Sequence, residues 1–438
     1  MRAGMMGLCL VALTWSGAAL GADGLVVKSV IHAEGQPVVS GGVIAVAGDN
    51  GFAGGGMTTV WEADGAGNWN LAAKLLHGGP AALSNGTLVL ADRSTQVFTT
   101  NPVRVYGKDA SGTWYEQTTL TGNNVDVCDF FGSSVGVDGD WAVVGAFNYG
   151  GGPPNPWCHP STGGVFIFKR DAAGTWTQTQ VIAPAPLGGG ATINNFGWNL
   201  VLGHGKLFVA ANEELPMVNN AEPSRGLVYV YTPDASGQWQ FTNKVPGESI
   251  FMGFAATDDW LVTGSPSKPD AVAVYTPATT GGWQVDQTLT ADPGATGIYG
   301  VGTAVSGSLL AVTAGPDSQV CPASGCGSPS PPAPGRLYAY GLAAGQWQPM
   351  GIYASPEVKS LLMEDAVITD GRTVVADGIM TDTDGQKQSG FVVMQSGSVP
   401  MGYAPVTTDG GYTTTSSSGE FGWLPALLLF ALVGLRRC

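Results

Sequence analysis

The chain has 438 residues, of which 67 are glycine, 13 are tryptophan and only 12% are charged, and its formal net charge is −15. Such an acidic chain lacks the basic surface on which phosphate contacts depend, which argues against a nucleic-acid partner. Amphipathic helical runs are missing, whereas short β-branched runs bounded by Gly, Pro, Asp and Asn recur throughout. This pattern predicts an all-β fold.

The first 21 residues have the pattern of a secretory signal peptide. Arg2 precedes an apolar run from Met5 to Leu20, and small residues in Ala19-Leu20-Gly21 occupy the positions that a signal peptidase reads. The run is too short for a membrane-spanning helix. We therefore expect the chain to be exported and residues 1–21 to be removed.

A frame that begins with an aromatic residue and glycine recurs along the chain. Each copy continues with an alternating strand, a Gly turn and a second strand that ends in small residues. The copies are Phe131 to Ala146 (FGSSVGVDGDWAVVGA), Phe196 to Ala211, Tyr299 to Ala314 and, with a gap, Phe251 to Ser265. Recurrence at fixed length is typical of a propeller or another repeat architecture.

The first copy also contains Gly132-Ser133-Ser134-Val135-Gly136, which matches the G-x-S-x-G pattern of serine hydrolases. A nucleophile elbow needs a strand, a sharp turn and a helix, with the serine at the turn. Here Ser134 is predicted in the middle of a strand, and the other copies have Asn199 and Gly302 at its position. We therefore interpret Ser134 as a repeat residue and assign no catalytic residue.

Each of seven units has a third strand, and six of them continue through a Gly turn into a fourth strand that starts at tryptophan. These tryptophans, predicted to be packing residues, are Trp69, Trp114, Trp176, Trp239, Trp283 and Trp347. The seventh unit lacks its fourth strand, and Gly24 to His32 is expected to supply it, since closing the ring removes exposed sheet edges. Residues 22–405 are therefore predicted to form a seven-bladed β-propeller of four-stranded blades.

The third unit, FGSSVGVDGDWAVVGA followed by GGVFIFKRDAAGTWTQTQVI, resembles an FG-GAP repeat. This is the unit of the integrin α-chain propeller and of many bacterial exported proteins, and the resemblance extends over nearly all of residues 25–405. Integrin-type repeats often carry a calcium loop between their first two strands. The corresponding turns here (VDGDW, LGHGK, VSGSL) are too short and too poor in carboxylates. We expect no cofactor; Ca²⁺ is not favoured, and Asp382 and Asp384, in a different loop, are the metal candidates.

Four cysteines of the propeller are expected to form disulfides in an exported chain. Cys128 precedes a first strand and Cys158 lies between a second and a third strand, and both connections open on the same face of a propeller. Cys321 and Cys326, in CPASGC, are placed to close a small ring. The alternative, metal ligation, would need C-x-x-C pairs that these cysteines do not form.

The longest connections are predicted between second and third strands, and all of them should lie on one face. They are Asn148 to Gly163, Asn212 to Gly226 and Gly315 to Gly335. Loops held by a rigid scaffold are where binding usually occurs. The candidate ligand contacts are Trp157 and His159 in the first loop and Glu213 and Glu214 in the second.

The C-terminal part is predicted to lie outside the fold. Residues 406–420 are small and polar, typical of a flexible linker, and residues 421–438 form a short apolar segment that ends in Arg436-Arg437-Cys438. This tail resembles the GlyGly-type sorting signals of Gram-negative bacteria, which a rhomboid-type protease removes. Gly410-Gly411 lies further upstream than in that family, and a cysteine follows the arginines; a plain membrane anchor is the alternative.

Together these features predict an exported β-propeller at the cell surface or in the medium. We expect this protein to have no enzymatic activity. It would act as a binding or adhesion module for an extracellular protein or glycan through its loops, while its tail meets a sorting protease or the membrane. The alternative is a propeller enzyme, a lyase or hydrolase, with a site in the central channel or on the loop side. A cluster of Asp, Glu, His and Arg in the channel would favour the enzyme, but the expected inner strands carry apolar and small residues.

Overall fold

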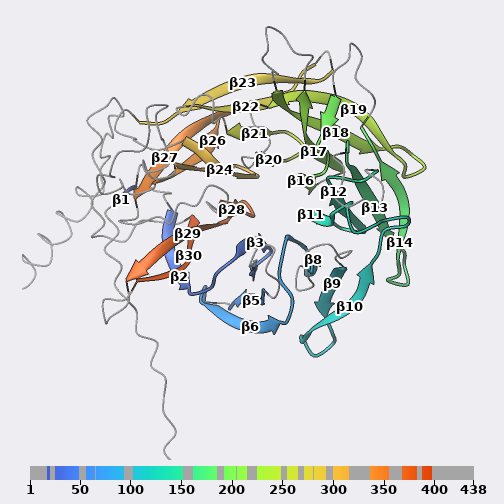
Figure 1. Cartoon of the computed structure of the whole chain (residues 1–438). Coiled ribbons are helices and arrows are strands. Elements are labelled where there is room, and N and C mark those ends of the chain that lie inside the picture. Colours follow the sequence, from blue (N-terminus) through green and yellow to red (C-terminus); the bar gives the residue numbers. More distant parts are fainter. Residues whose placement is uncertain are drawn as a thin grey trace, which may run out of the picture.

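The structure is a computed structural model. It describes residues 17–19, 25–48, 56–64, 66–92, 102–150, 161–184, 192–203, 205–214, 224–247, 254–264, 271–279, 281–292, 299–314, 336–354, 367–381 and 387–396. In these ranges the chain is all-β, and seven antiparallel sheets stand as blades in a ring (Figure 1). The seven-bladed β-propeller predicted above is confirmed. None of these residues belongs to a helix that could cross a membrane.

Each blade adds its strands in chain order from the centre outward. Blade 1 consists of β3 (Gln36–Ser40), β4 (Val43–Ala47), β5 (Thr58–Ala63) and β6 (Trp69–Leu75). Blade 2 consists of β7 (Ala81–Ser84), β8 (Thr87–Ala91), β9 (Val103–Lys108) and β10 (Trp114–Leu120). Blade 3 consists of β11 (Phe131–Asp138), β12 (Trp141–Ala146), β13 (Gly164–Arg170) and β14 (Trp176–Ile182).

Blades 4 to 6 follow the same order, and blade 7 takes its outermost strand from the N-terminal part of the chain. Blade 4 consists of β15 (Thr192–Asn194), β16 (Leu200–Gly203), β17 (Lys206–Glu214), β18 (Ser224–Pro233) and β19 (Trp239–Gly247). Blade 5 consists of β20 (Phe254–Ala256), β21 (Leu261–Gly264), β22 (Ala271–Pro277) and β23 (Trp283–Thr290). Blade 6 consists of β24 (Tyr299–Ser306), β25 (Leu309–Ala314), β26 (Arg336–Ala343) and β27 (Gln346–Ala354). Blade 7 consists of β28 (Val367–Thr369), β29 (Thr373–Thr381), β30 (Lys387–Ser396) and β2 (Leu25–Ile31).

The N-terminal strand closes the ring, as predicted. β2 pairs antiparallel with β30, from Leu25 opposite Ser396 to Ile31 opposite Phe391. Leu25 takes the place that tryptophan holds at the start of the other outer strands; its side chain is buried between blades 6 and 7. Its backbone N–H donates a hydrogen bond to Tyr353 Oη at 2.7 Å, so the closing strand is also tied to blade 6.

A short strand lies beside blade 6. β1 (Gly17–Ala19) pairs with the outer edge of β27, with Gly17 opposite Tyr353 (Figure 1). These three residues belong to the segment predicted as a signal peptide. The removal of that segment stays a prediction.

The hydrophobic core lies between the blades. The described residues form seven buried clusters, and each cluster joins side chains of two neighbouring blades. The tryptophans at or next to the start of the outer strands pack into these clusters towards the preceding blade, which confirms their predicted packing role. Trp347, for example, is 1% exposed and packs in the cluster that joins blades 5 and 6.

The recurring glycines let neighbouring blades touch through their backbones. Gly197, in the aromatic-Gly pair of blade 4, has φ +89°, and a Cβ on Gly145 of blade 3 would lie 2.1 Å from its carbonyl oxygen. Gly264 of blade 5 and Gly300 of blade 6 repeat this contact at 1.8 Å. A side chain at either position would overlap the next blade, so the repeat needs glycine there.

We expect Gly145→Ala to destabilise the fold by about 1–3 kcal/mol, because the added methyl group overlaps a backbone oxygen that cannot move alone. Gly203→Ala is the matched control. A Cβ there meets nothing within 4 Å, so this change should be neutral or slightly stabilising. Urea unfolding of both variants measures the difference. Equal stabilities would show that the blades do not need this close approach.

The side of the ring where third strands turn into fourth strands is here called the turn face. Four of these turns start with aspartate, and its Oδ1 accepts hydrogen bonds from the backbone N–H groups two and four residues later. The four are Asp64, Asp109, Asp171 and Asp234. In the second turn the side chain of Ser111 and the backbone of Thr113 lower the pKa of Asp109. Blades 1 to 4 therefore repeat one local structure on this face.

Candidate functional site

The opposite side of the ring, here called the loop face, carries the connections between second and third strands and the crossovers between blades. Four of the described acidic side chains are buried, and all of them lie at this end of the blades. They are Asp92, Asp129, Glu213 and Asp292. Because a buried carboxylate is costly unless it is paired, each of them marks a point that the fold holds in place.

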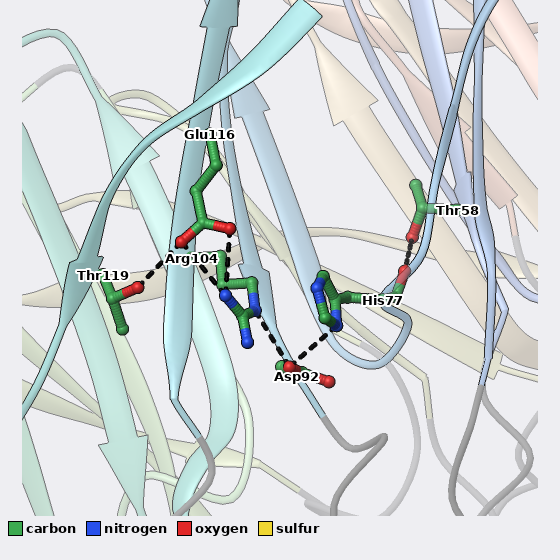
Figure 2. A network of polar contacts seen from close by, with 6 residues as sticks. All are labelled: Thr58, His77, Asp92, Arg104, Glu116 and Thr119. Carbon is green, nitrogen blue, oxygen red and sulfur yellow. Dashed lines mark hydrogen bonds and ion pairs between the residues drawn. The ribbon is translucent and has the colours of Figure 1, made fainter.

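One network on the loop face is centred on Asp92, directly after β8 (Figure 2). Oδ2 of Asp92 lies 2.9 Å from Nε of Arg104 on β9 and 2.8 Å from Nδ1 of His77, in the crossover from blade 1 to blade 2. Figure 2 shows the Asp92 carboxylate between the guanidinium and the imidazole ring. One side chain thus joins the crossover to two strands of blade 2.

The network extends to the outer strand of blade 2 and to blade 1. Nη1 of Arg104 donates to both carboxylate oxygens of Glu116 on β10, at 3.0 and 2.9 Å, and Thr119 donates to Glu116 as well. Thr58 Oγ1 donates to the backbone oxygen of His77 at 2.7 Å. Burial works to lower the pKa of Arg104, but its hydrogen bonds to Asp92 and Glu116 outweigh burial and raise it. The guanidinium therefore stays charged.

Blade 6 has a related contact between a crossover and its third strand, also on the loop face. Asp292, in the crossover from blade 5, is buried, and both of its carboxylate oxygens accept from Nη1 of Arg336 at the start of β26, at 2.7 and 2.6 Å. Tyr338 on the same strand donates to Asp292 through its hydroxyl group. Burial and this hydrogen bond raise the pKa of Tyr338. The crossover is again fastened to the third strand of the following blade.

In blade 3, backbone groups satisfy the buried carboxylate. Asp129 accepts from the N–H groups of Asp126 and Gly150, at 2.8 and 3.2 Å, and burial raises the pKa of Asp129. Asn148 donates to the carbonyl oxygen of Cys128 and accepts from the N–H of Ser161. Together these contacts hold the crossover against the connection between β12 and β13.

Cys128 is buried and disulfide-bonded. Its predicted partner, Cys158, lies outside the described residues, so the pairing stays a prediction. Trp157, His159, Cys321, Cys326, Asp382 and Asp384 also lie outside them. Within the described ranges, no three His, Cys, Asp or Glu side chains gather as metal ligands.

Glu213 and Glu214 lie on the loop face, but the prediction that they belong to a loop is wrong. They are the last residues of β17 and pair on one side with β15, at Ile193 and Thr192, and on the other with β18. The inner strand of blade 4 is split into β15 and β16, so β17 and β18 continue past the expected end of the blade. Glu213 is buried, whereas Glu214 is partly exposed.

Ser134 lies within β11, as predicted, and its hydroxyl group contributes to the packing of two blades. Ser134 Oγ donates to the carbonyl oxygen of Gly197 in blade 4 at 2.7 Å, and Ser133 Oγ donates to the same oxygen at 3.2 Å. The side chain of Ser134 is buried. A hydroxyl group that donates to a backbone carbonyl is engaged in packing, so the interpretation as a repeat residue holds.

Ser134→Ala is expected to cost about 1 kcal/mol of unfolding free energy, since one buried hydrogen bond between blades is lost. The loss should stay small because Ser133 keeps a bond to the same oxygen. Thermal unfolding measures the change. A fluorophosphonate probe on the folded protein provides the chemical control: labelling that disappears in the variant would contradict the repeat interpretation.

Sequence reasoning missed the network of His77, Asp92 and Arg104. The three residues lie on three different connections or strands, and no short motif joins them. One signal was available: Asp92 directly follows a second strand and Arg104 lies near the start of the third, so the two belong to neighbouring strands of one hairpin. The role of His77 depends on the crossover geometry, which only the structure provides.

Comparisons with known proteins found one family match and similar solved structures. Residues 114–168 match the family model described as FG-GAP repeat, which covers β10 to β13 up to Phe168. A search of curated proteins found no match. The solved structure of the periplasmic gluconolactonase PpgL of Pseudomonas aeruginosa is similar at 15% identity and a TM-score of 0.33, covering 63% of this chain and 96% of that one. The chain is thus a seven-bladed β-propeller in which one segment matches an FG-GAP repeat.

Proposed function

We propose that the chain is an exported binding module that recognises an extracellular protein or glycan through its loop face. The observation that carries this proposal is the difference between the two faces. The turn face repeats one aspartate turn in blades 1 to 4, whereas the loop face has connections of different lengths, such as residues 147–163 and 315–335. Varied loops on a uniform scaffold are typical of binding proteins.

Buried aspartates hold the crossovers of the loop face in place, which favours ligand binding. Asp92, Asp129 and Asp292 each hold a crossover to the following blade through paired or backbone contacts. Anchored loop ends reduce the conformational entropy that a ligand must overcome, so less of the interaction energy is lost on binding.

A propeller enzyme, a lyase or hydrolase, remains the second candidate. One contact favours it: Asp92 holds Nδ1 of His77, and a carboxylate at that nitrogen orients an imidazole for proton transfer at the other nitrogen. His77→Gln separates the two functions. Loss of turnover on a candidate substrate with retained substrate binding would favour the enzyme, whereas a binding module has no turnover to lose.

The binding proposal can be tested by blocking one face at a time. Leu76, which is 81% exposed, lies on the loop face, and Ala110 lies in an exposed turn on the turn face. A polyethylene glycol chain attached to Leu76→Cys should abolish capture of ligands found by glycan array and pull-down. The same chain on Ala110→Cys should leave capture unchanged, and treated wild type controls for the native cysteines. Equal effects at both sites would contradict the proposal.

We also propose that the tail directs the protein to the cell surface or the medium. The Gly- and Ser-containing linker and the short apolar segment with a basic end support a sorting signal. The intact mass of the released protein tests this proposal, since residues 420–438 should be absent. A mass that includes Arg436 and Arg437 would favour the membrane anchor instead.

A further inference from the structure

Three aromatic side chains gather on the loop face where blades 3 and 4 meet. Phe130 precedes β11, Phe147 follows β12 and Trp198 precedes β16. The rings of Phe130 and Phe147 stack with centroids 4.7 Å apart and an angle of 15° between their planes. The Phe147 and Trp198 rings follow at 4.6 Å and 59°. All three residues are partly exposed, although large aromatic side chains in this fold are mostly buried between blades.

Phe130 adopts a backbone conformation that a bulky residue rarely takes. Its φ is +55°, in the left-handed region. Asn195 holds the equivalent position before the aromatic-Gly pair of blade 4 and has φ +58°. In both blades the carbonyl oxygen at this position accepts a hydrogen bond from the N–H three residues later, at Ser133 and Trp198.

The turn itself therefore demands the left-handed conformation, and asparagine meets this demand at less cost than phenylalanine. A partly exposed phenylalanine at a strained position needs a reason, because strain is characteristic of functional sites. Stacking on Phe147 offsets part of the cost. Stacking between the rings, however, does not explain why the three side chains are partly exposed to solvent.

The geometry of the rings restricts the kind of ligand. A cage for a quaternary ammonium group needs a space between aromatic faces, but Phe130 and Phe147 are already in contact with each other. The three rings instead lie in series, Phe130 against Phe147 and Phe147 against Trp198, and each is partly exposed. The C–H groups on one face of a sugar ring carry slight positive charge and pack well against the negative face of an aromatic ring.

The surroundings favour a neutral ligand. The net charge of −15 repels anionic chains. The neighbouring carboxylate of Asp129 is buried and accepts hydrogen bonds from two backbone N–H groups, so it is already engaged within the protein. Asn194, Asn195 and Asn199, partly exposed beside Trp198, add amide groups that can pair with hydroxyl groups.

We propose that Phe130, Phe147 and Trp198 form a platform that binds a neutral glycan. This inference rests on the proposed function and names the ligand class and the place on the loop face. The apolar face of a sugar lies on the rings, and its hydroxyl groups contact the neighbouring amides and water. A protein partner at this surface is the alternative that the experiment below must distinguish.

Calorimetry with cellohexaose and chitohexaose as neutral probes, and with a polygalacturonate oligomer as the anionic comparison, tests the platform. Phe130→Asn introduces the residue that blade 4 already uses, so its melting temperature should stay close to that of the wild type. At least one neutral probe should bind the wild type. Its Kd should rise about tenfold or more in Phe130→Asn and in Trp198→Ala, as expected when a central aromatic contact is removed.

Tyr115→Ala is the matched control, since Tyr115 is 46% exposed on β10, away from the platform. Its Kd should equal that of the wild type. If a neutral glycan binds equally well to wild type and to both platform variants, the glycan does not bind at the platform, whereas the proposed binding function is retained. If no probe binds, or only the anionic one does, the glycan inference is overturned. A purified protein ligand whose binding is lost in Phe130→Asn would likewise overturn the glycan inference and would retain the binding function.

Discussion

Deletion of Gly24 to His32 is expected to open the propeller ring and to lower its stability sharply. The deletion removes β2, the outer strand of blade 7, and exposes the edge of β30. It also removes Leu25 and Ile31, which are buried on the two sides of blade 7. Burial of these two side chains alone is worth about 3–6 kcal/mol, a large part of a total stability of about 5–15 kcal/mol.

Urea unfolding followed by circular dichroism measures the loss. Removal of residues 1–21 alone is the matched control, because it leaves β2 in place, and this variant should retain most of its stability. Ile31→Ala is a milder test of the same interface and should cost about 2–5 kcal/mol. A chain without residues 24–32 that melts like the wild type would show that the ring does not depend on this closure.

Trp347→Ala should be the most destabilising of the tryptophan substitutions, at about 3–5 kcal/mol, because the side chain is fully buried between blades 5 and 6. Trp283 begins the outer strand of blade 5 at the equivalent position but is only partly buried. Trp283→Ala should therefore cost clearly less. Thermal unfolding of the two variants tests whether burial, and not position in the repeat, sets the stability.

Phenylalanine substitutions refine this test. Within the described residues Trp347 Nε1 has no hydrogen-bond partner, whereas Trp114 Nε1 donates to Glu62 Oε1 at 2.6 Å. Trp347→Phe should thus lose only packing, while Trp114→Phe leaves Glu62 without one donor as well. If Trp347→Phe and Trp114→Phe lower the free energy of unfolding equally, the hydrogen bond from Trp114 to Glu62 contributes nothing to stability.

The backbone of Trp347 adds a contact between blades that the substitutions leave intact. The side chain of Gln287 on β23 accepts from the N–H of Trp347 and donates to its carbonyl oxygen, each at 2.9 Å. Gln180 on β14 makes the same pair of bonds to Trp239. A reduced effect of Trp347→Ala would mean that these backbone contacts hold the strand in place without the ring.

Local patterns in the sequence were sufficient to predict the number of blades, the order of their strands and the closing strand. Alternating apolar residues, Gly turns and tryptophans act over a few residues, so their recurrence predicts a repeated strand unit without knowledge of contacts. The placement of Ser134 within a strand was predictable for the same reason. Glu213 and Glu214 were misplaced because the extra strand β15 extends blade 4, and nothing near the two glutamates indicates its pairing.

Only the tertiary structure decided which side chains meet between strands and between blades. His77, Asp92 and Arg104 come from a crossover and two strands, and their contacts depend on the angle at which blade 2 follows blade 1. The stacking of Phe130 on Phe147 needs the register of β11 and β12, and Trp198 joins them because blade 4 packs against blade 3. Sequence periodicity predicts each strand, but the distances between side chains on different strands depend on how the blades twist and pack.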